Sequence, residues 1–308
     1  VDLLACLPPQ IALQYQTPSN SLLFPAPTKL PKPFFHVRAG QYIVLLRRML
    51  ACGMLSFTRT PLAVNGLFAV PKPDGRQRLI IDCRPAAALC VAPPRLQLPT
   101  PELFGMLQLE PNMKFVVCGE DHSDFFYQFA LPPAWHDMFA LPPVDAAEFG
   151  LGDGMIYPTV TVVAMGFSYS PYWTHTAHQF IVYSCVGLDP RDAILPGNDL
   201  RLNRLRHSIY LDDFNLFDVA TTPASDSRIS AAQLRYQDVC HSKGFVLNVK
   251  KRQLPSSDDV EVLGVELNGN RRSAGHNGQP PRPRTRYQFP RCPSHTTASL
   301  PYRATDAP

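Results

Sequence analysis

The sequence predicts an α+β fold, because it combines antiparallel hairpins with separate amphipathic helices. One hairpin is centred on Asp212 and Asp213, and a second spans residues 66–84. Apolar residues recur at helical spacing in residues 39–50 and 230–244. The chain has 308 residues, 45% of them hydrophobic, which is enough to bury one large core or two modest ones.

The first hairpin carries two adjacent carboxylates. Apolar and polar residues alternate over 208–211 and again over 214–217, which predicts two strands. The two turn-tolerant residues between them predict a tight turn with Asp212 and Asp213 at its tip. Such a tip can hold carboxylates at the edge of a cleft, where a divalent metal would bind. Taken alone, an ordinary solvated Asp-Asp turn is the better explanation.

The second hairpin has a Pro-Asp-Gly turn at residues 73–75. Its strands carry four cations, which are Lys72, Arg76, Arg78 and Arg84. Cations on a hairpin rim can guard an edge strand against aggregation. They can also clamp a phosphate, for which Arg offers a bidentate fork. On these residues alone the solvated rim is favoured.

A buried strand is predicted over residues 114–121, and it ends in Glu120 and Asp121. An acid at the end of an apolar strand is costly unless it has a partner or a metal ion. Asp121 is therefore the second candidate metal ligand.

The remaining elements follow from shorter patterns. Helices are predicted over 39–50 with Gly53 as the C-terminal cap, over 99–109 with Thr100 as N-cap, after the loop 165–171, and over 230–244. Strands are predicted over 245–251, over 261–267 with a central Gly264, and with turns over 130–164. His175 and His178 lie three residues apart, which suggests zinc, but no further ligand has suitable spacing. Histidines on the helix surface or in its packing are favoured.

The two ends differ from the middle in composition. Residues 1–40 predict an irregular, Pro-rich lead-in, and 41–270 hold the periodic patterns. Residues 271–308 predict a disordered Arg/Pro-rich tail with a net charge of +6, against −2 for the rest of the chain. The tail could bind nucleic acid weakly through counterion release. A frame-shifted or truncated end explains it equally well.

Composition also bears on the setting. The eight cysteines include no Cys-x-x-Cys pair, which favours a reducing intracellular location, in cytoplasm or nucleus, over a disulfide framework or a zinc ribbon. The sequence contains no run of about 18 uncharged apolar residues, so no membrane span is expected. The chain begins with Val1 and has no leader pattern, so we expect a piece of a longer product.

Together these blocks resemble a reverse transcriptase of a retroelement, of the LTR or DIRS type. The resemblance covers about residues 53–268, and six blocks occur in the family's order. Any one block is weak, whereas six at family-like spacing are a strong signal. It implies a right-hand polymerase fold, with an antiparallel palm sheet backed by helices and a fingers hairpin inserted before it. No thumb helices follow, so the thumb is expected to be largely missing.

The resemblance implies a catalytic centre. Tyr210 to Asp213 match the family's YxDD box, and Asp121, followed by Phe126 and Gln128, matches its first acidic box. Asp121, Asp212 and Asp213 would then serve two Mg²⁺ ions, with Mn²⁺ as a substitute. Asp213 would assist electrostatically or orient the loop. Lys251 falls where the family has a lysine proposed to protonate the leaving pyrophosphate.

The resemblance also implies substrate contacts. Lys72 and Arg78 would hold the triphosphate, and a bulky Phe126 beneath the sugar would exclude a 2′-hydroxyl. The loop from Met165 to Pro171 matches the block that touches template and nucleotide, and Leu263-Gly264 matches the primer grip. The residues implied are, for the nucleotide, Lys72, Arg78, Phe126 and Gly166, and for template or primer, Phe167, Ser170, Pro171, Tyr210, Leu263 and Gly264.

The implied function is template-directed synthesis of DNA, using an RNA or DNA template, a DNA primer and deoxynucleoside triphosphates. Other domains of a longer polyprotein, such as RNase H, a recombinase or an integrase, are expected as partners. Three alternatives stay open: an inactive or co-opted nucleic-acid-binding relic, an RNA-dependent RNA polymerase, and a non-catalytic α/β domain. The three aspartates count against decay, and the missing thumb counts for it.

Overall fold

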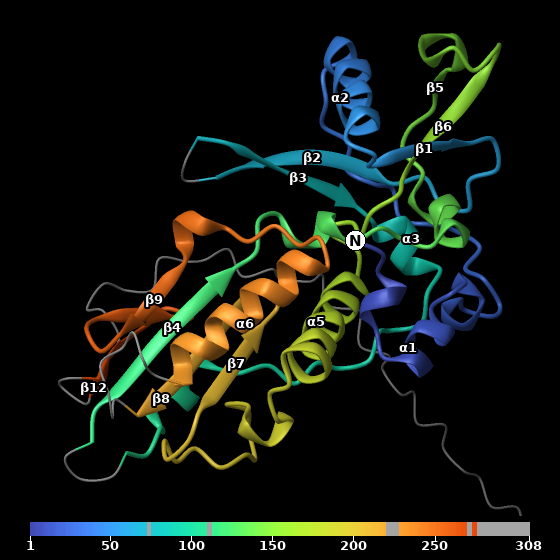
Figure 1. Cartoon of the computed structure of the whole chain (residues 1–308). Helices are drawn as coiled ribbons and strands as arrows, with labels where there is room; N and C mark the ends of the chain where they lie inside the picture. The colour runs from blue at the N-terminus through green and yellow to red at the C-terminus, as the bar shows by residue number, and fades with distance from the viewer. Residues whose placement is uncertain (73–74, 110–112, 220–227, 270–272, 276–308) are drawn as a thin grey trace, which may run out of the picture.

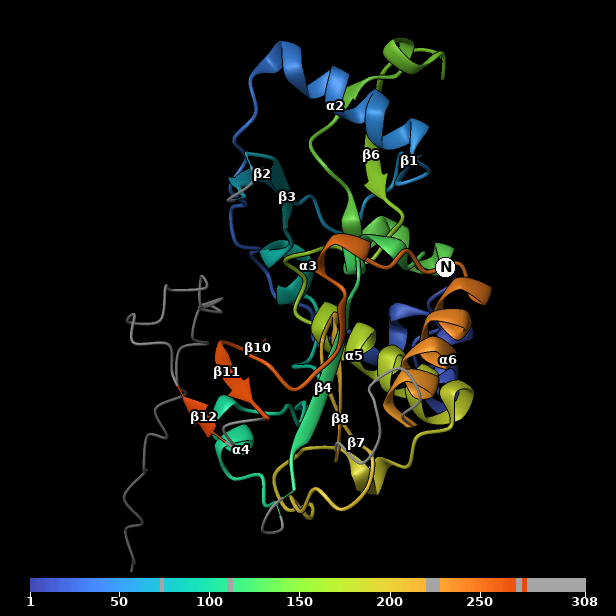
Figure 2. The same cartoon turned by 60° about the vertical axis from the view of Figure 1, so that its left-hand side comes forward.

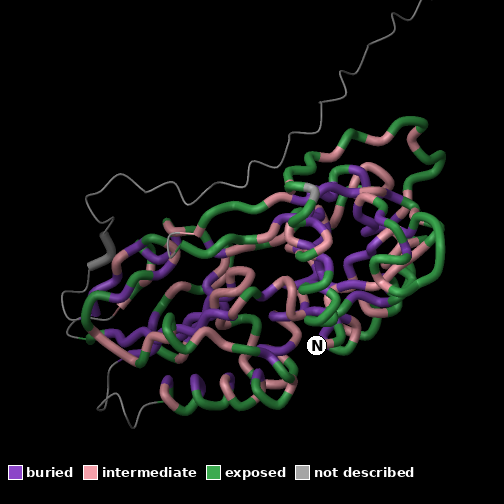
Figure 3. Tube along the Cα trace, turned by 90° about the horizontal axis from the view of Figure 1, so that it is seen from above, coloured by how far each residue is buried: buried purple, intermediate pink, exposed green. Residues whose placement is uncertain are grey.

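The computed structural model describes residues 1–72, 75–109, 113–219, 228–269 and 273–275. A central sheet lies in one part of the molecule, and a long hairpin with a smaller sheet lies in the other (Figure 1). Buried residues run through both parts (Figure 3). No described helix combines the length and the apolar character that crossing a membrane requires.

The central sheet is antiparallel and has the strand order β7-β8-β4-β9. Its strands are β4 (Phe115–Asp121), β7 (Arg206–Tyr210), β8 (Asp213–Val219) and β9 (Gln253–Ser256). The predicted strand before Asp121 and the predicted pair of strands around the Asp-Asp motif are therefore confirmed.

The tip of the β7–β8 hairpin differs from the prediction by one residue. Tyr210 pairs with Asp213, so the turn consists of Leu211 and Asp212, and Asp213 begins β8. Leu211 has a φ of 54°, a left-handed conformation that is unfavourable for a leucine. The alternation of apolar residues could not distinguish the two registers, because Asp213 is tolerated both in a turn and at the start of a strand.

Two helices cover one face of the central sheet (Figure 2). They are α5 (Ser170–Phe180), continued by the π-helical segment η6 (Ile181–Val186), and α6 (Arg228–Ser242). Glu120 of β4 anchors α6, because its carboxylate accepts hydrogen bonds from the amides of Gln233 and Gln237, at 2.9 and 2.6 Å. Both helix predictions are confirmed.

The other face is covered by a second hydrophobic cluster. It includes α4 (Pro101–Gly105), β10 (Val260–Val262) and β11 (Val265–Asn268), and β11 pairs with β12 (Ser273–Gly275). The single strand predicted over 261–267 is wrong. Leu263 and Gly264 have φ of 50° and 81° and form the turn of a hairpin instead, because two consecutive positive φ angles reverse the chain.

The boundaries predicted at both ends need correction. Strand β12 lies inside the segment predicted to be a disordered tail, and residues 271–272 and 276–308 lie outside the described residues. The expected lack of thumb helices concerns that same undescribed stretch. In the lead-in, three short helices form: η1 (Leu4–Cys6), α1 (Pro9–Gln14) and η2 (Pro18–Ser21). Tyr15 is buried in the main core, and its carbonyl accepts a 2.8 Å hydrogen bond from the indole of Trp135.

The pair of strands predicted over residues 66–84 is confirmed, while residues 73 and 74 of the predicted Pro-Asp-Gly turn lie outside the described residues. The pair consists of β2 (Gly66–Pro71) and β3 (Gln77–Asp82), and α3 (Arg84–Ala88) follows it. Asp82 accepts bonds from Arg84, at 2.6 Å, and from the backbone N–H of Phe34. These bonds keep the pKa of the Asp82 carboxyl below its ordinary value, although burial opposes them.

Above the hairpin, α2 (Ala39–Ala51) confirms the predicted helix, and Gly53 follows it with a φ of 69°. A three-stranded sheet of order β1-β6-β5 lies beside it. Its strands are β1 (Leu55–Thr58), β5 (Val144–Asp145) and β6 (Met155–Val160).

Short 3-10 segments complete the fold. They are η3 (Phe125–Gln128), η4 (Pro133–Phe139), η5 (Ala146–Phe149), η7 (Pro190–Asp192) and η9 (Val249–Lys251). The strand predicted over 245–251 is therefore wrong. Only Phe245 of its apolar residues is fully buried, whereas Val246 and Val249 are exposed, so its alternation does not mark a sheet face.

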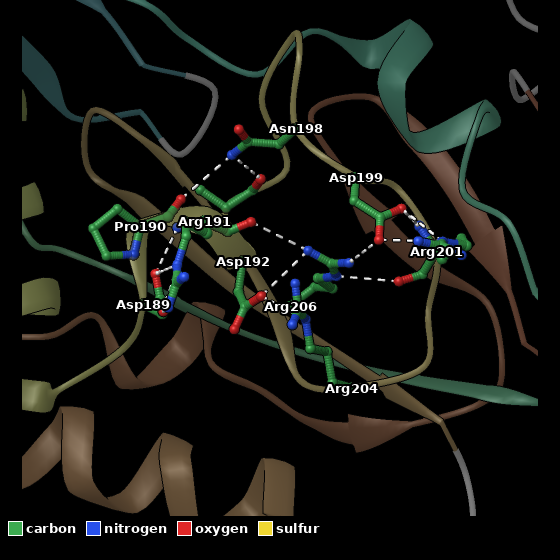
Figure 4. Close-up of polar contacts among 10 residues, drawn as sticks. Asp189, Pro190, Arg191, Asp192, Asn198, Asp199, Arg201, Arg204 and Arg206 are labelled. Atoms are coloured by element: carbon green, nitrogen blue, oxygen red, sulfur yellow. Dashed lines mark hydrogen bonds and ion pairs between the residues drawn. The ribbon is translucent and has the colours of Figure 1, made fainter.

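A buried arginine organises the loop before β7 (Figure 4). The guanidinium of Arg206 is fully buried and donates to the carbonyls of Arg201 and Arg191, at 3.1 and 3.3 Å. It also forms ion pairs with Asp192 at 3.3 Å and Asp199 at 3.2 Å. This one side chain therefore ties both halves of the loop to the base of the central sheet.

We expect Arg206→Ala to lower the free energy of unfolding by about 2–4 kcal/mol, because two carbonyls and two carboxylates lose a buried partner. The matched control is Arg204→Ala, which also removes an ion pair with Asp192 (2.7 Å) but at a half-exposed position. It should cost less than about 1 kcal/mol. Urea unfolding of both variants measures the difference, and equal losses would contradict the role given to Arg206.

Candidate metal and nucleotide site

Two carboxylates meet at one end of the central sheet. Asp121 is the last residue of β4, and Asp212 lies in the turn that precedes β8. Because β4 and β8 are neighbours in the ladder, Asp121 lies directly opposite Asp213. The structure therefore brings the three predicted acids to one edge, although they come from positions about 90 residues apart in the chain.

Asp121 is nearly buried and each of its oxygens has a partner. Oδ1 lies 3.0 Å from the ammonium of Lys251, and Oδ2 accepts a 3.0 Å hydrogen bond from the amide of Asn248. The backbone N–H of Asn248 donates to the carbonyl of Asp121 at 2.7 Å. A buried carboxylate is stable only with such partners, and Lys251 supplies the compensating positive charge.

Asp212 is partly buried, and it faces the charge of Asp121. Burial first, and the Asp121 carboxylate second, raise the pKa of the Asp212 carboxyl above its ordinary value, while Lys251 and Arg78 oppose the rise. Two like charges held close in a partly desolvated site destabilise each other. A divalent cation between them would remove that penalty.

The donor set fits Mg²⁺ or Mn²⁺ only in part. Within the described residues, no group of three or more His, Cys, Asp or Glu side chains is arranged to hold a metal ion. The expected three-carboxylate set is thus not assembled as such. Mg²⁺ is commonly held by one or two carboxylates, with substrate phosphates and water completing its octahedron. Asp121 and Asp212 meet that lesser requirement.

The β2–β3 hairpin lies above the end of β4 (Figure 1). The ammonium of Lys72 lies 3.0 Å from Asp124, three residues beyond Asp121. Arg78 of β3 is close enough to Asp212 to influence the titration of its carboxyl. The hydroxyl of Tyr127 donates to the carbonyl of Leu79 at 2.6 Å. Lys72 thus contacts the segment that follows Asp121, and Arg78 lies near Asp212.

Gly166 allows the loop 165–171 to approach the hairpin closely. Its φ is 121°, and a Cβ at this position would lie 2.1 Å from the carbonyl oxygen of Ile81. The N–H of Ile81 donates to the carbonyl of Met165 at 3.0 Å. Only glycine fits both the backbone conformation and the contact.

Two of the residues predicted to contact template or primer are buried. The Phe167 ring is 1% exposed and packs among Trp135, Phe139 and Trp173. Ser170 is equally buried, and its hydroxyl donates to the carbonyl of Ala164 at 2.7 Å. Their side chains hold the loop together and are not available to nucleic acid, because a loop that must approach another backbone packs its side chains inward.

The other predicted contact residues have mixed surroundings. Phe126, Pro171, Tyr210 and Leu263 are partly buried. Phe126 packs against the main core and Leu263 against the second cluster, while Gly264 occupies the β10–β11 turn. Phe126 is only partly buried, so part of its side chain remains accessible.

Sequence reasoning missed several residues of the site. The sequence predicts a strand at Asn248, and the bond of Asn248 to Asp121 depends on how the chain passes β4. His122, His178 and Tyr236 form a buried chain of hydrogen bonds beneath the acidic edge. The sequence offers one signal for them, a histidine directly after Asp121. The sequence predicts His178 to be a helix-surface or packing histidine; the structure buries it and gives it hydrogen bonds to Leu211 and Tyr236.

The fold and site define a polymerase-like arrangement: acids on adjacent strands of an antiparallel sheet, beneath a cationic hairpin. Comparison with solved structures agrees. The chain is similar to a foamy viral protease-reverse transcriptase in complex with dsDNA, with a TM-score of 0.56, 17% identity, and coverage of 85% of this chain and 46% of that chain. The chain is also similar to a foamy viral protease-reverse transcriptase designated dRH, likewise in complex with dsDNA. Here the TM-score is 0.54 and the identity 17%, and the match covers 84% of this chain and 38% of that chain.

The protein therefore has a reverse transcriptase-like fold. The chain spans less than half the length of these two matched chains. No family model and no curated protein matches the sequence. We call the central sheet with its helices the palm, and the β2–β3 hairpin with the β1-β6-β5 sheet and α2 the fingers.

We expect Asp212→Asn to raise the melting temperature at pH 7 without metal. The pKa of Asp212 is higher in the folded than in the unfolded chain, so the folded state binds more protons and loses stability as pH rises through that window. The gain from the variant should vanish in acid, where the carboxyl is protonated in both states. Thermal melts from pH 3 to 8 in chelator test this.

Mg²⁺ should reverse the ranking of the two proteins. It should raise the melting temperature of the wild type, by binding the folded state, and leave that of the variant unchanged. A variant that melts below the wild type at pH 7 in chelator would show that the Asp121–Asp212 repulsion is not significant.

Proposed function

We propose that the protein is an RNA-dependent DNA polymerase of a retrotransposon-like element, of LTR or DIRS type. The observation that carries the proposal is the meeting of Asp121, at the end of β4, with Asp212, in the turn before the neighbouring strand β8, beneath a fingers hairpin that carries Lys72 and Arg78. Acids on one side and cations on the other match what a metal-bound triphosphate requires.

The chain's own residues have distinct roles in this proposal. Asp121 and Asp212 would hold Mg²⁺ or Mn²⁺, assisted by Asp213; the metal would activate the primer 3′-hydroxyl and neutralise the phosphates. Lys72 and Arg78 would bind the triphosphate after Lys72 leaves Asp124. The Lys251 side chain is 64% exposed, so its ammonium would turn from Asp121 to give a proton to the departing pyrophosphate.

The proposed partners are an RNA or DNA template, a DNA primer and deoxynucleoside triphosphates. The matched foamy viral proteins were solved with dsDNA, and they are longer than this chain. Further domains of a polyprotein, such as RNase H, a recombinase or an integrase, would act with the polymerase, in the cytoplasm or nucleus. These proposals follow from the resemblance together with the reverse transcriptase-like fold.

Primer extension on an RNA template tests the function directly. With Mg²⁺ and deoxynucleotides, we expect the wild type to extend the primer and Asp212→Asn to lose about 10²-fold or more in rate. The control is Asp153→Asn, a change on an exposed turn of the fingers, which should extend normally. Equal extension by the wild type and Asp212→Asn would remove Asp212 from the site.

Phe126 should exclude ribonucleotides. We expect Phe126→Ala to improve the relative use of ribonucleotides about 10–100-fold, since sterically excluded groups gain access when a side chain is cut back. Tyr127→Phe is the control, because it keeps the ring next in sequence and removes the hydroxyl that bonds to Leu79. The ratio of kcat/KM values for the two sugars is the readout, and an unchanged ratio in Phe126→Ala would assign that ring to packing alone.

A further inference from the structure

A chain of three buried side chains lies beneath the acidic edge. The hydroxyl of Tyr236, on α6, is 2.7 Å from Nε2 of His178, on α5, and 2.7 Å from Nε2 of His122. Nδ1 of His178 lies 2.7 Å from the carbonyl oxygen of Leu211. The three side chains are fully or almost fully buried, and aromatic rings of Phe125, Phe214 and Phe245 enclose them.

Donors and acceptors can be assigned along the whole chain. The Leu211 carbonyl can only accept, so His178 carries its proton on Nδ1. Burial lowers the pKa of His178 to about 4, so its Nε2 is unprotonated and accepts the hydroxyl proton of Tyr236. Cys240 also lies within hydrogen-bonding reach of that hydroxyl, but a thiol sulfur is the weaker acceptor. The oxygen of Tyr236 then accepts from Nε2–H of His122.

The chain of bonds joins the two segments that carry the proposed metal ligands. Its first member, His122, directly follows Asp121. Its last bond ends on Leu211, which directly precedes Asp212 and has an unfavourable φ of 54°. A backbone held in such a conformation needs support from its surroundings. Side chains of the two helices that cover the palm therefore form hydrogen bonds with the segment after Asp121 and with the turn before Asp213.

A role in packing alone explains these residues poorly. Nδ1 of His122 is buried and has no hydrogen-bond partner among the described residues, which is costly. Apolar side chains of the same shape would fill the space without that cost. Hydrogen bonds have a defined direction and length, so this chain can fix the distance between its two ends. A fixed distance matters at a site whose two acids repel each other.

We infer that His122, Tyr236 and His178 are positioning residues, which set the separation of the Asp121 and Asp212 carboxylates for the divalent cation. The inference rests on the proposed function for its metal site. It assigns no proton transfer to the three residues. The hydrogen bond that Nδ1 of His178 donates to the Leu211 carbonyl, more than the bulk of the histidine, then determines how well Asp121 and Asp212 bind the metal.

Two substitutions of His178 separate position from packing. Asn places an amide nitrogen close to where His has Nδ1, so His178→Asn keeps the hydrogen bond to the Leu211 carbonyl and loses the one to Tyr236. Gln places its amide close to Nε2, so His178→Gln keeps the hydrogen bond to Tyr236 and loses the one to Leu211. With Mn²⁺ as the probe, titrated by electron paramagnetic resonance, we expect His178→Gln to bind 10–100-fold more weakly than His178→Asn. Equal affinities would overturn the inference.

Tyr236→Phe tests the centre of the chain. It should weaken Mn²⁺ binding 10–100-fold and lower kcat for primer extension, with the KM for deoxynucleotide unchanged. Tyr42→Phe is the matched control, since it removes another buried tyrosine hydroxyl, bonded to Pro142 at 2.8 Å in the fingers; its Mn²⁺ affinity should equal that of the wild type. Wild-type affinity in Tyr236→Phe would overturn the inference.

The readouts separate this inference from the proposed function. A wild type that binds Mn²⁺ but extends no primer would contradict the polymerase, while the affinities of the variants would still decide the positioning role. A wild type that binds no Mn²⁺ would overturn the inference, because there would be no metal pair to position.

Discussion

The antiparallel ladder between β4 and β8 is the constraint on which the acidic edge depends. It runs from Phe115 opposite Val219 to Asp121 opposite Asp213. A shift of one residue would turn every side chain to the other face. In the observed register Glu120 faces α6, where Gln233 and Gln237 bind it, and Asp121 lies on the opposite face. The hydrogen bonds of Glu120 therefore support the position of its neighbour.

The ladder also creates an electrostatic cost, because it brings negative charges together at one end. Lys251 and Asn248 compensate Asp121, whereas Asp212 keeps a raised pKa. Hydrophobic clusters on both faces of the palm supply the stability that this edge lowers. Strain at Leu211 and repulsion at Asp212 are thus concentrated where the proposed chemistry takes place, as is common at functional sites.

The fingers and palm meet through backbone contacts as much as through side chains. Gly166 lets its loop touch the carbonyl of Ile81, and Tyr127 binds the carbonyl of Leu79. The ion pair of Lys72 with Asp124 adds a bond that a triphosphate could replace. Since backbone contacts do not depend on pH or salt, they hold the hairpin above the acidic edge whichever partner Lys72 has.

The sequence by itself determined the elements that depend on local patterns: the two hairpins, α2, α5, α6 and β4. Their signals are periodicity and turn residues, which act over a few neighbours. It also pointed to Asp121 and Asp212, because an acid at the end of an apolar strand is costly unless a partner or a metal ion compensates its charge. The resemblance, and not local physics, ordered these blocks into a polymerase.

Only the tertiary structure decided the rest. The tip of the hairpin, the β10–β11 turn and the strand β12 depend on pairing partners that a local pattern cannot name. Phe167 and Ser170 are buried because their loop packs against distant aromatic rings. Asn248, His178 and Tyr236 reach the acidic edge from elsewhere in the chain. Such contacts join residues remote in sequence, so only the closed fold determines which of them meet.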